Sequence, residues 1–527
     1  MITPVDAAPN PHTESLCSAP KYAWAKSILF VQNYQGTGGT ENIGNMLAQH
    51  NSGAKGAQLK LSNATLIDVT LKGDGSKFPL HNHITQTDQN GITRTTLEVI
   101  AWDSNSDFSD IQSQAGRHIG RGPFGLAIEK ICLKNYFLNL GHKTTKSETT
   151  TNAQSNANRL DGVLIKSPDG FELNPSAIAS MKEAIEDAAP HVVYVAQDHA
   201  TTLVTEAIKQ LNDVRPIGER IGIVYGIHRE DLSVEDTLNN EKDFCVATNM
   251  RASYGAIQVA VVCSRSAGQN YASVGGNPYA LKEVENGTDC EKFARNDKAR
   301  HQFREQHDIP QDAKVITLAG RYSPEKDMTA CVRIISEVLQ RPGNEAVHFV
   351  GCGAMLSSDN RDLQNLLKNT LGDLQSLKER IHFLGFQDMP AVMSATDIVL
   401  STSRTESWGL TLLEAAAAGC IAVYSDLPGT RNAMGRLAED YSLCVKRQQA
   451  EKTDPLFPNY RMLSDESIGE FVDKLQEALA LSEDPEARQA HLDRARETDI
   501  SKMYDGYLEA FQQAYQKANS TLAGFPF

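Results

Sequence analysis

The sequence predicts an α/β protein built from two doubly wound parallel sheets. Short apolar runs alternate with longer stretches compatible with helices, which is the rhythm of parallel strands joined by crossover helices. This rhythm begins afresh near Lys314, and a length of 527 residues is ample for two large domains. We therefore expect two Rossmann-like domains in one chain.

The expected strands are short apolar runs bounded by polar residues or glycine. They cover residues 28–31, 191–195, 221–227 and 259–264 in the first half, and 314–320, 346–351, 381–385, 397–401 and 421–425 in the second half. Near the end, Tyr504, Tyr507, Phe511 and Tyr515 recur at the spacing of one helix face, which predicts a closing helix over 501–520.

Domain bounds follow from changes in this rhythm. Residues 1–20 are expected to form a flexible lead-in, because Pro, Asp and Glu interrupt any continuous apolar stretch. The first domain is expected over 21–297, with an irregular insertion at about 60–160 rich in Thr, Asn, Ser and His. The second is expected over 298–499, and residues 500–527 as a C-terminal helix that packs back on the first domain.

Composition excludes several classes of protein. A net charge of -15 and a pI near 5.5 argue against a broad nucleic-acid surface, which needs clustered Lys and Arg. The nine cysteines are dispersed and form no C-x-x-C pair, which favours reduced thiols in a cytoplasmic protein. No window approaches the ~20 apolar residues of a spanning helix, so we expect any membrane contact to be peripheral.

The segment with the clearest chemistry is DIVLSTSRTESWGLTLLEAAAAGCIAVYSD, residues 397–426. It predicts a strand, a polar loop, an alanine-rich helix that stops at Gly419, and another strand. The loop lies where open α/β sheets bind ligands, and the amides after Gly409 would offer a helix N-terminus to phosphate. Glu406 and Glu414 suit sugar and ribose hydroxyls. Taken alone, the two acids would more often be a charge at a helix N-terminus and one partner of a salt bridge than a ligand site.

A second polar loop, GRYSPEKD, directly follows the strand that begins at Lys314. Gly320, Arg321 and Lys326 would lie at the same sheet edge. Arg binds a diphosphate in fork geometry and Lys binds it as a point charge. Considered in isolation, this loop would fit a solvated charged turn.

Together these segments resemble the donor half of glycosyltransferase family 4. The ordered series is G-R-x-x-x-x-K at 320–326, VGCG at 350–353, RIHFLGF at 380–386, ESWGLTLLE at 406–414 and LPG at 427–429. The resemblance covers about a fifth of the chain, over 314–430. It implies the GT-B fold, in which two Rossmann-like domains face a central cleft, and sugar transfer from a nucleotide diphosphate with retention of configuration.

The resemblance also implies roles for single residues. Arg321 and Lys326 would hold the donor diphosphate next to Gly320, with backbone amides from Gly409 and Leu410. Glu406 would face the transferred sugar and Glu414 would bind the ribose. One departure is the stretch Thr430, Arg431 and Asn432, where many relatives carry another acid, so no role is assigned there.

The first half carries weaker signals. The glycine loop NYQGTGGTEN follows the strand at 28–31, and its resemblance to a family loop favours Gly38, Gly39 and Glu41 as cleft residues. His228 ends a strand, and the resemblance implies that it enters the cleft near the reacting sugar. Asp198 or His199 is an alternative cleft residue, because Ala196 occupies the position where the resemblance implies a histidine. His81 and His83 lack a complete ligand set, so no metal is expected.

The sequence therefore predicts a retaining hexosyltransferase with Glu406, His228, Arg321 and Lys326 as its catalytic residues. Its expected partners are a UDP- or GDP-sugar and a hydroxyl acceptor, with no cofactor beyond the donor itself. Three alternatives stay open: a nucleotide-sugar epimerase, a phosphorylase, and a noncatalytic protein that binds a nucleotide-sugar.

Overall fold

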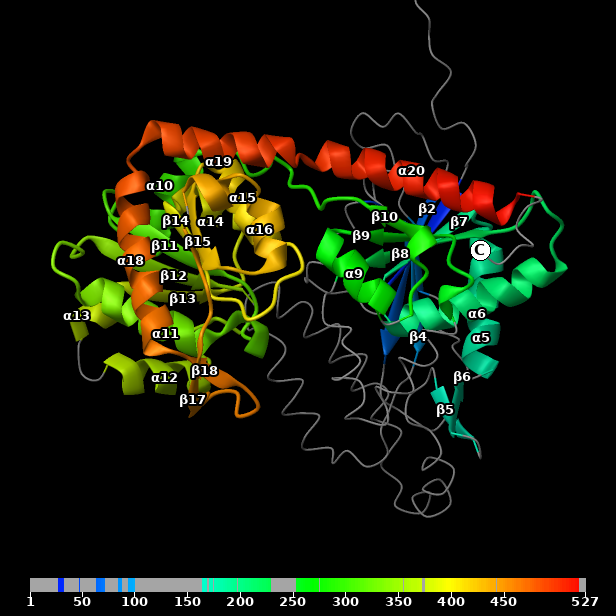
Figure 1. The fold of residues 1–527 in the computed structure, drawn as a ribbon, viewed down its shortest axis with the longest axis horizontal. Coiled ribbons are helices and arrows are strands. Elements are labelled where there is room, and N and C mark those ends of the chain that lie inside the picture. Colours follow the sequence, from blue (N-terminus) through cyan, green and yellow to red (C-terminus); the bar gives the residue numbers. More distant parts are fainter. Residues whose placement is uncertain are drawn as a thin grey trace, which may run out of the picture.

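The structure is a computed structural model of the full chain. It describes residues 27–32, 47, 63–71, 84–87, 93–99, 164–167, 170–173, 175–196, 198–228, 253–273, 275–353, 355–371, 375–441 and 443–520. Two large β-sheets lie side by side, each with helices packed on it (Figure 1). The predicted α/β class with two parallel sheets is confirmed.

The first sheet has eight strands in the order β10-β9-β8-β7-β1-β2-β4-β3. All neighbouring strands are parallel except β3 and β4. The strands are β1 (Ser27–Gln32), β2 (Asn63–Leu71), β3 (Ile84–Thr87), β4 (Thr93–Val99), β7 (Val192–Ala196), β8 (Gly222–Ile227), β9 (Val259–Val262) and β10 (Leu281–Glu283). β5 (Leu164–Ser167) and β6 (Gly170–Leu173) form a separate hairpin.

Both faces of the central strands β7 and β8 are covered. On one face, Val193 and Ile223 join an apolar cluster with residues of three helices, which are α5 (Pro175–Ala188), α6 (Asp198–Val214) and α9 (Arg265–Ser273). On the other face, Tyr194 and Val224 pack against α20 (Ile500–Ala518). Burial on both faces explains why these strands are continuous apolar runs in the sequence.

The second sheet is parallel throughout, in the order β13-β12-β11-β14-β15-β16. Its strands are β11 (Lys314–Ala319), β12 (Val347–Cys352), β13 (Ile381–Gly385), β14 (Ile398–Ser401), β15 (Ile421–Ser425) and β16 (Cys444–Val445). This is the doubly wound order 3-2-1-4-5-6. Its order reverses between β11 and β14, so a crevice is expected at the carboxyl ends of these two strands.

Helices cover both faces of the second sheet. On one face lie α11 (Met328–Gln340), α12 (Arg361–Leu371), α13 (Gln375–Lys378) and α18 (Asp465–Leu481). On the other lie α10 (Asp297–Gln306), α14 (Met389–Ala395), α15 (Leu410–Ala417), α16 (Pro428–Met434), α17 (Leu437–Asp440) and α19 (Pro485–Glu497). Two short 3-10 turns, η1 (Pro278–Ala280) and η2 (Pro324–Lys326), and a hairpin of β17 (Gln449–Thr453) and β18 (Arg461–Leu463) complete the described elements.

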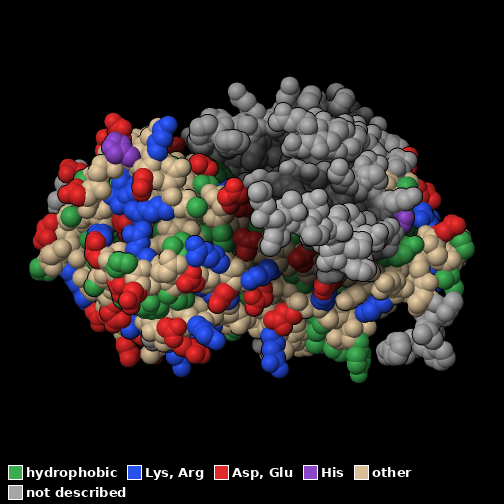
Figure 2. All heavy atoms as spheres, turned by 90° about the horizontal axis from the view of Figure 1, so that it is seen from above, with side chains coloured by type: hydrophobic (Ala, Val, Ile, Leu, Met, Phe, Trp, Pro, Cys, Tyr) green, Lys and Arg blue, Asp and Glu red, His purple; other side chains and the backbone are tan. Residues whose placement is uncertain are grey.

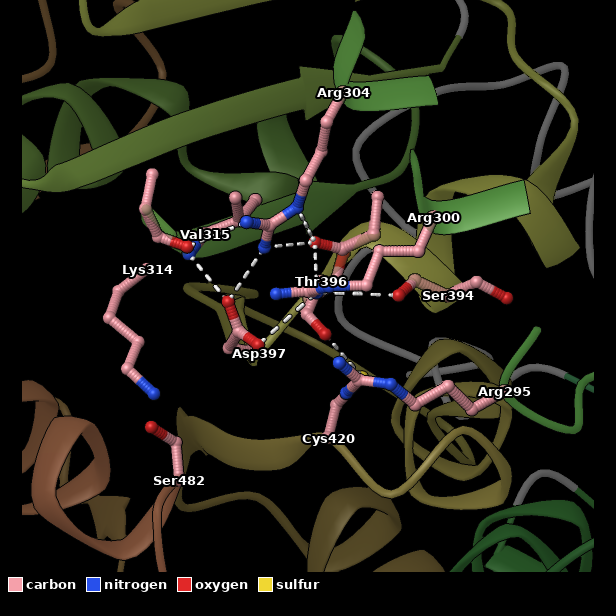
Figure 3. Close-up of polar contacts among 12 residues, drawn as sticks. Arg295, Arg300, Arg304, Lys314, Val315, Ser394, Thr396, Asp397, Cys420 and Ser482 are labelled. Atoms are coloured by element: carbon pink, nitrogen blue, oxygen red, sulfur yellow. Dashed lines mark hydrogen bonds and ion pairs between the residues drawn. The ribbon is translucent and has the colours of Figure 1, made fainter. Parts of the chain in front are cut away.

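A buried ion cluster holds α10 against the amino end of β14. The guanidinium of Arg304 is 0% exposed and donates to Asp397 Oδ2 at 2.9 Å. Arg300 Nη1 lies 3.3 Å from the other carboxylate oxygen, and Val315 N donates to Oδ2 at 2.9 Å. Figure 3 shows both guanidinium groups directed at this carboxylate. The remaining Arg304 donors bind the backbone carbonyls of Ala395, Pro310, Gln311 and Ala313.

The two connections between the domains touch each other. Thr288 N donates to Thr498 O at 3.0 Å, and Ile500 N donates to Thr288 O at 2.9 Å. A Cβ at Gly287 would lie 2.6 Å from the Cα of Ile500, so this approach requires glycine. Beyond this point α20 lies over the first sheet, whereas α19 lies over the second (Figure 1).

Each apolar run predicted as a strand coincides with a strand of the structure within a few residues. The expectation of an irregular insertion at 60–160 needs correction, because β2, β3 and β4 within it extend the first sheet. Their many threonines suit a strand but hide it in a search for apolar runs. Residues 1–20, the expected lead-in, lie outside the described residues.

The visible surface carries acidic side chains among the basic ones over both domains (Figure 2). Within the described part of the chain, no helix combines the length and the apolar character needed to cross a membrane.

Candidate donor site

The candidate site lies where the order of the second sheet reverses. The loop after β11 carries Gly320, Arg321 and Lys326, and the loop after β14 carries Glu406 and leads into α15. Because both strands end at the same edge, these two loops face each other. The structure thus brings together side chains that are 80 residues apart in the sequence.

Lys326 and Glu406 form an ion pair across the two loops. Lys326 Nζ donates to Glu406 Oε2 at 2.6 Å, and the two side chains are 24% and 20% exposed. Ser403 Oγ lies 3.4 Å from the same amine. The pair is therefore accessible to a ligand yet partly shielded from water, which strengthens its electrostatic effect.

The N-terminus of α15 lies next to this pair. Gly409 adopts φ of 84°, a left-handed conformation that favours glycine, and no side chain caps the helix. The first turn contains no acidic residue. Leu412 N donates to Gly409 O at 2.9 Å, and the N–H groups before it, together with the helix dipole, favour an anion. Gly409, Leu410 and Lys326 can thus contribute to one anion site.

Glu414 lies one turn further along α15. Burial raises its pKa to about 7, and the charge of Lys292 opposes this shift. Burial, with a smaller contribution from Glu414, also raises the pKa of Cys352 to about 12. The charge of Glu414 therefore affects Cys352 at the end of β12. Glu414 itself changes its ionisation near neutral pH.

Two glycines of the sequence pattern support the loops by close backbone contact. A Cβ at Gly353 would lie 1.9 Å from Gly320 O. A Cβ at Gly429 would lie 2.0 Å from Glu406 O and 2.5 Å from Ser407 C. The VGCG and LPG segments thus act as backbone supports for the two loops.

Lys326, Glu406 and Gly409 line one pocket together with Ser401 and Thr411. A larger cavity of about 420 Å³ lies between α11, α12 and the β17–β18 hairpin, and it contains none of the predicted site residues. We place the candidate site at the smaller pocket because its cation, its carboxylate and its open helix end converge there. Arg321 does not line this pocket; its side chain is exposed, and no described residue pairs with its guanidinium.

His228 meets the Glu406 loop from the first domain. It follows β8, and its Nε2 lies 2.8 Å from the hydroxyl of Tyr194 and 3.5 Å from that of Tyr507. Burial lowers its pKa to about 4, so the imidazole is neutral at pH 7. Ser407 Oγ donates to His228 O at 2.5 Å. Within the described residues, His228 Nδ1 is buried without a hydrogen-bond partner.

The remaining residues named from the sequence lie elsewhere. Arg431, in the stretch that departs from the family pattern, pairs with Asp426 at 2.8 Å through Nη2. Gly38, Gly39 and Glu41 lie outside the described residues, and so does the side chain of His199, although its backbone belongs to the first turn of α6. Among the described residues, no group of three or more His, Cys, Asp or Glu side chains is arranged to hold a metal ion.

Comparison with known families agrees with this geometry. Residues 313–452 match the family described as "Glycosyl transferases group 1". The matched segment belongs to this family and makes up most of the second domain, which we call the group 1 domain. The resemblance to glycosyltransferase family 4 is thus confirmed for the group 1 domain, which contains Gly320, Lys326, Glu406 and Glu414.

Curated relatives of the group 1 domain match over part of their length. D-inositol 3-phosphate glycosyltransferase of Salinispora tropica is 31% identical over 167 residues, which are 30% of this chain and 34% of that protein. The O-antigen biosynthesis glycosyltransferase WclY of Escherichia coli is 29% identical over 32% of this chain and 43% of that protein. The chain thus covers about a third of the first relatives that it matches.

Solved structures match the whole architecture. Anabaena HepE in complex with UDP and glucose gives a TM-score of 0.55 at 16% identity, over 92% of this chain and 99% of that one. Sucrose-phosphate synthase from Thermosynechococcus elongatus gives 0.58 at 14% identity, over 92% and 98%. These similarities confirm the GT-B fold around the group 1 domain.

The sequence did not single out the residues that join the two loops of the group 1 domain. Asp327 and Arg404 form an ion pair of 2.8 Å between them. In the sequence both look like solvated loop charges, because their burial depends on contacts with distant segments. Asp327 and Arg404 lie among other polar residues, and nothing in the sequence distinguishes their role from that of Lys326 and Glu406.

Proposed function

We propose that this protein is a retaining glycosyltransferase that moves a sugar from a nucleotide diphosphate sugar to a hydroxyl acceptor. The observation that carries the proposal is the Lys326–Glu406 pair beside the uncapped N-terminus of α15. A cation and free backbone amides suit a diphosphate, and an adjacent carboxylate suits sugar hydroxyls.

In this proposal the donor separates the ion pair. The diphosphate binds to the Lys326 amine and to the backbone amides of α15, with Arg321 at the exposed side. Glu406 then accepts hydrogen bonds from the transferred sugar, and Glu414 accepts them from the ribose. A diphosphate offers Lys326 more negative charge than the single carboxylate of Glu406, so the exchange is electrostatically favourable.

The reaction breaks the bond between the anomeric carbon and the diphosphate oxygen. A bond forms between that carbon and the acceptor oxygen on the same face, and the acceptor proton passes to the departing phosphate oxygen. Lys326 and Arg321 stabilise the charge that develops on the leaving group. His228 contributes a neutral imidazole from the first domain, and no protein nucleophile is required.

The names of relatives support a UDP- or GDP-sugar as donor. HepE was solved with UDP-glucose, and a Mycolicibacterium smegmatis relative, 26% identical over 31% of this chain and 42% of that protein, is called a GDP-mannose-dependent mannosyltransferase. We propose that the acceptor binds on the first-domain side of the cleft, near His228.

The test is a donor screen on the full chain with UDP-, GDP- and ADP-sugars, measuring thermal shift and release of nucleoside diphosphate. Lys326→Ala should reduce transfer about a hundredfold or more, because it removes leaving-group stabilisation. Lys314→Ala is the matched control, since Lys314 also pairs with a glutamate, Glu483, away from the pocket.

Equal rates for Lys326→Ala and the wild type would refute the assigned role. Products analysed without acceptor would reveal an epimerase, and products formed with inorganic phosphate would reveal a phosphorylase. Donor binding without any turnover would indicate a noncatalytic protein.

A further inference from the structure

We propose that Arg404, Asp327 and Asp454 form a clamp that positions Lys326 against Glu406. None of the three lines the pocket that contains Lys326 and Glu406, so they act through other residues. The inference rests on the proposed function for its catalytic consequence, and on geometry alone for the clamp itself.

Arg404 connects three segments. Its backbone N–H donates to Glu325 O at 2.7 Å and its Nε donates to Pro324 O at 3.0 Å, so it holds the loop that ends in Lys326. Its Nη2 pairs with Asp327 Oδ1 at 2.8 Å and also binds Asp454. The side chain is only 8% exposed. Arg404 lies two residues before Glu406, so it links the loop of the acid to that of the cation.

Asp327 contributes to the clamp from the loop after β11, which also carries Lys326. It is fully buried and adopts φ of 49°, a left-handed conformation that is unusual for a residue other than glycine. Its carboxylate accepts from Ala330 N, which caps α11, and it pairs with both Arg404 and Arg447. These contacts hold the strained residue in place directly after Lys326.

Further bonds close the clamp. Thr402 Oγ1 donates to Lys326 O at 2.8 Å, and Arg447 Nη1 donates to Thr402 O at 2.6 Å. Asp454 accepts from Thr329 Oγ1 at 2.8 Å, which ties the β17–β18 connection to α11. Two arginines balance two aspartates, so the buried charges are paired. The backbones on either side of the Lys326–Glu406 pair are therefore fixed to each other.

Arg304 provides a matched comparison at the opposite end of β14. It too is a buried arginine that binds backbone carbonyls, and it pairs with one aspartate where Arg404 pairs with two. Arg304 pairs with Asp397, which directly precedes β14 (Figure 3), whereas Arg404 follows the carboxyl end of β14. A purely structural role would give the two arginines the same phenotype.

The experiment compares Arg404→Lys and Asp454→Asn with Arg304→Lys in the full chain. The first measurement is the acylation rate of Lys326 by acetic anhydride, followed by mass spectrometry with Lys474 on α18, which pairs with Glu477, as the internal reference. We expect Lys326 to react severalfold faster in Arg404→Lys and Asp454→Asn, because its carboxylate partner is no longer held in place, and at the wild-type rate in Arg304→Lys.

The second measurement is steady-state transfer. In Arg404→Lys, kcat should fall by about tenfold to a hundredfold, since a displacement of about 1 Å can cost that much, while the acceptor KM stays unchanged. Equal Lys326 labelling in Arg404→Lys and Arg304→Lys overturns the clamp. If the wild type turns over no donor, the proposed function fails, and the labelling result still decides the clamp.

Discussion

At the scale of single residues, burial brings the ionisation of Glu414 on α15 close to neutral pH. Glu406 has a lysine 2.6 Å away, whereas burial raises the pKa of Glu414 to about 7. In the absence of donor, Glu414 is therefore largely protonated below pH 7 and largely ionised above it. An ionised carboxylate accepts stronger hydrogen bonds from ribose hydroxyls than a protonated one.

Donor affinity should therefore rise with pH through about 7. We expect Kd for the donor found in the screen to be about tenfold lower at pH 8 than at pH 6, as the ionised fraction of Glu414 rises from about a tenth to about nine tenths. A nucleotide-sugar is the right probe because its diphosphate does not titrate in this range. Calorimetry on Glu414→Gln should show no such rise, and an unchanged pH dependence in that variant would exclude Glu414 as its source.

The residues that could be predicted are those whose chemistry is visible along the chain. Lys326 and Glu406 occur in segments with a recognisable order, and the structure places them in contact. Arg404 could not be distinguished from them, because its partners Asp327 and Asp454 are 77 and 50 residues away and no local pattern encodes such contacts. His228 was predicted from the family resemblance, but its contact with Tyr507 depends on where α20 packs.

At the scale of elements, apolar runs predicted the buried strands well and missed those with polar side chains. β7, β8 and β15 are buried at every position, which leaves a continuous apolar run in the sequence. β2 and β4 contain threonines and charged residues and have no such run. The sequence pattern contained Gly429 but did not predict its supporting role. The backbone atoms next to Gly429 belong to another loop, the one that carries Glu406.

The first turn of α16 offers a test of that support. Gly429→Ala should improve intrinsic helix propensity, yet its Cβ would meet Glu406 O at 2.0 Å, so the Glu406 loop must shift. We expect transfer to fall about tenfold or more and the thermal midpoint to drop. Gly469→Ala on α18 is the control, because nothing lies within 4 Å of its Cβ. It should stabilise the protein by up to about 1 kcal/mol and leave transfer unchanged. Equal transfer rates in the two variants would contradict the support role.

At the scale of the whole molecule, two doubly wound sheets could be predicted from the α/β rhythm, whereas the docking of the two domains could not. Trp408 follows Ser407 in the donor loop, which is the loop after β14 that carries Glu406, and its side chain is 2% exposed. It belongs to the apolar cluster that includes Ile223 and Tyr271 of the first domain. Cys263 and His228 contact the adjacent Ser407. The donor loop is therefore also a contact between the domains, which couples their approach to the position of Glu406.

Trp408→Ala should consequently separate the domains as well as destabilise the fold. Removing a buried tryptophan typically costs about 3 to 5 kcal/mol, and part of this loss falls on the contact between the domains. Small-angle scattering should show a larger radius of gyration. Phe471→Ala is the matched control, since Phe471 is 0% exposed within the core of the second domain and lies outside the cluster of Trp408. It should lower the thermal midpoint without changing the radius of gyration. If both variants kept the wild-type radius, Trp408 would be a core residue only, and the position of Glu406 would not depend on domain docking.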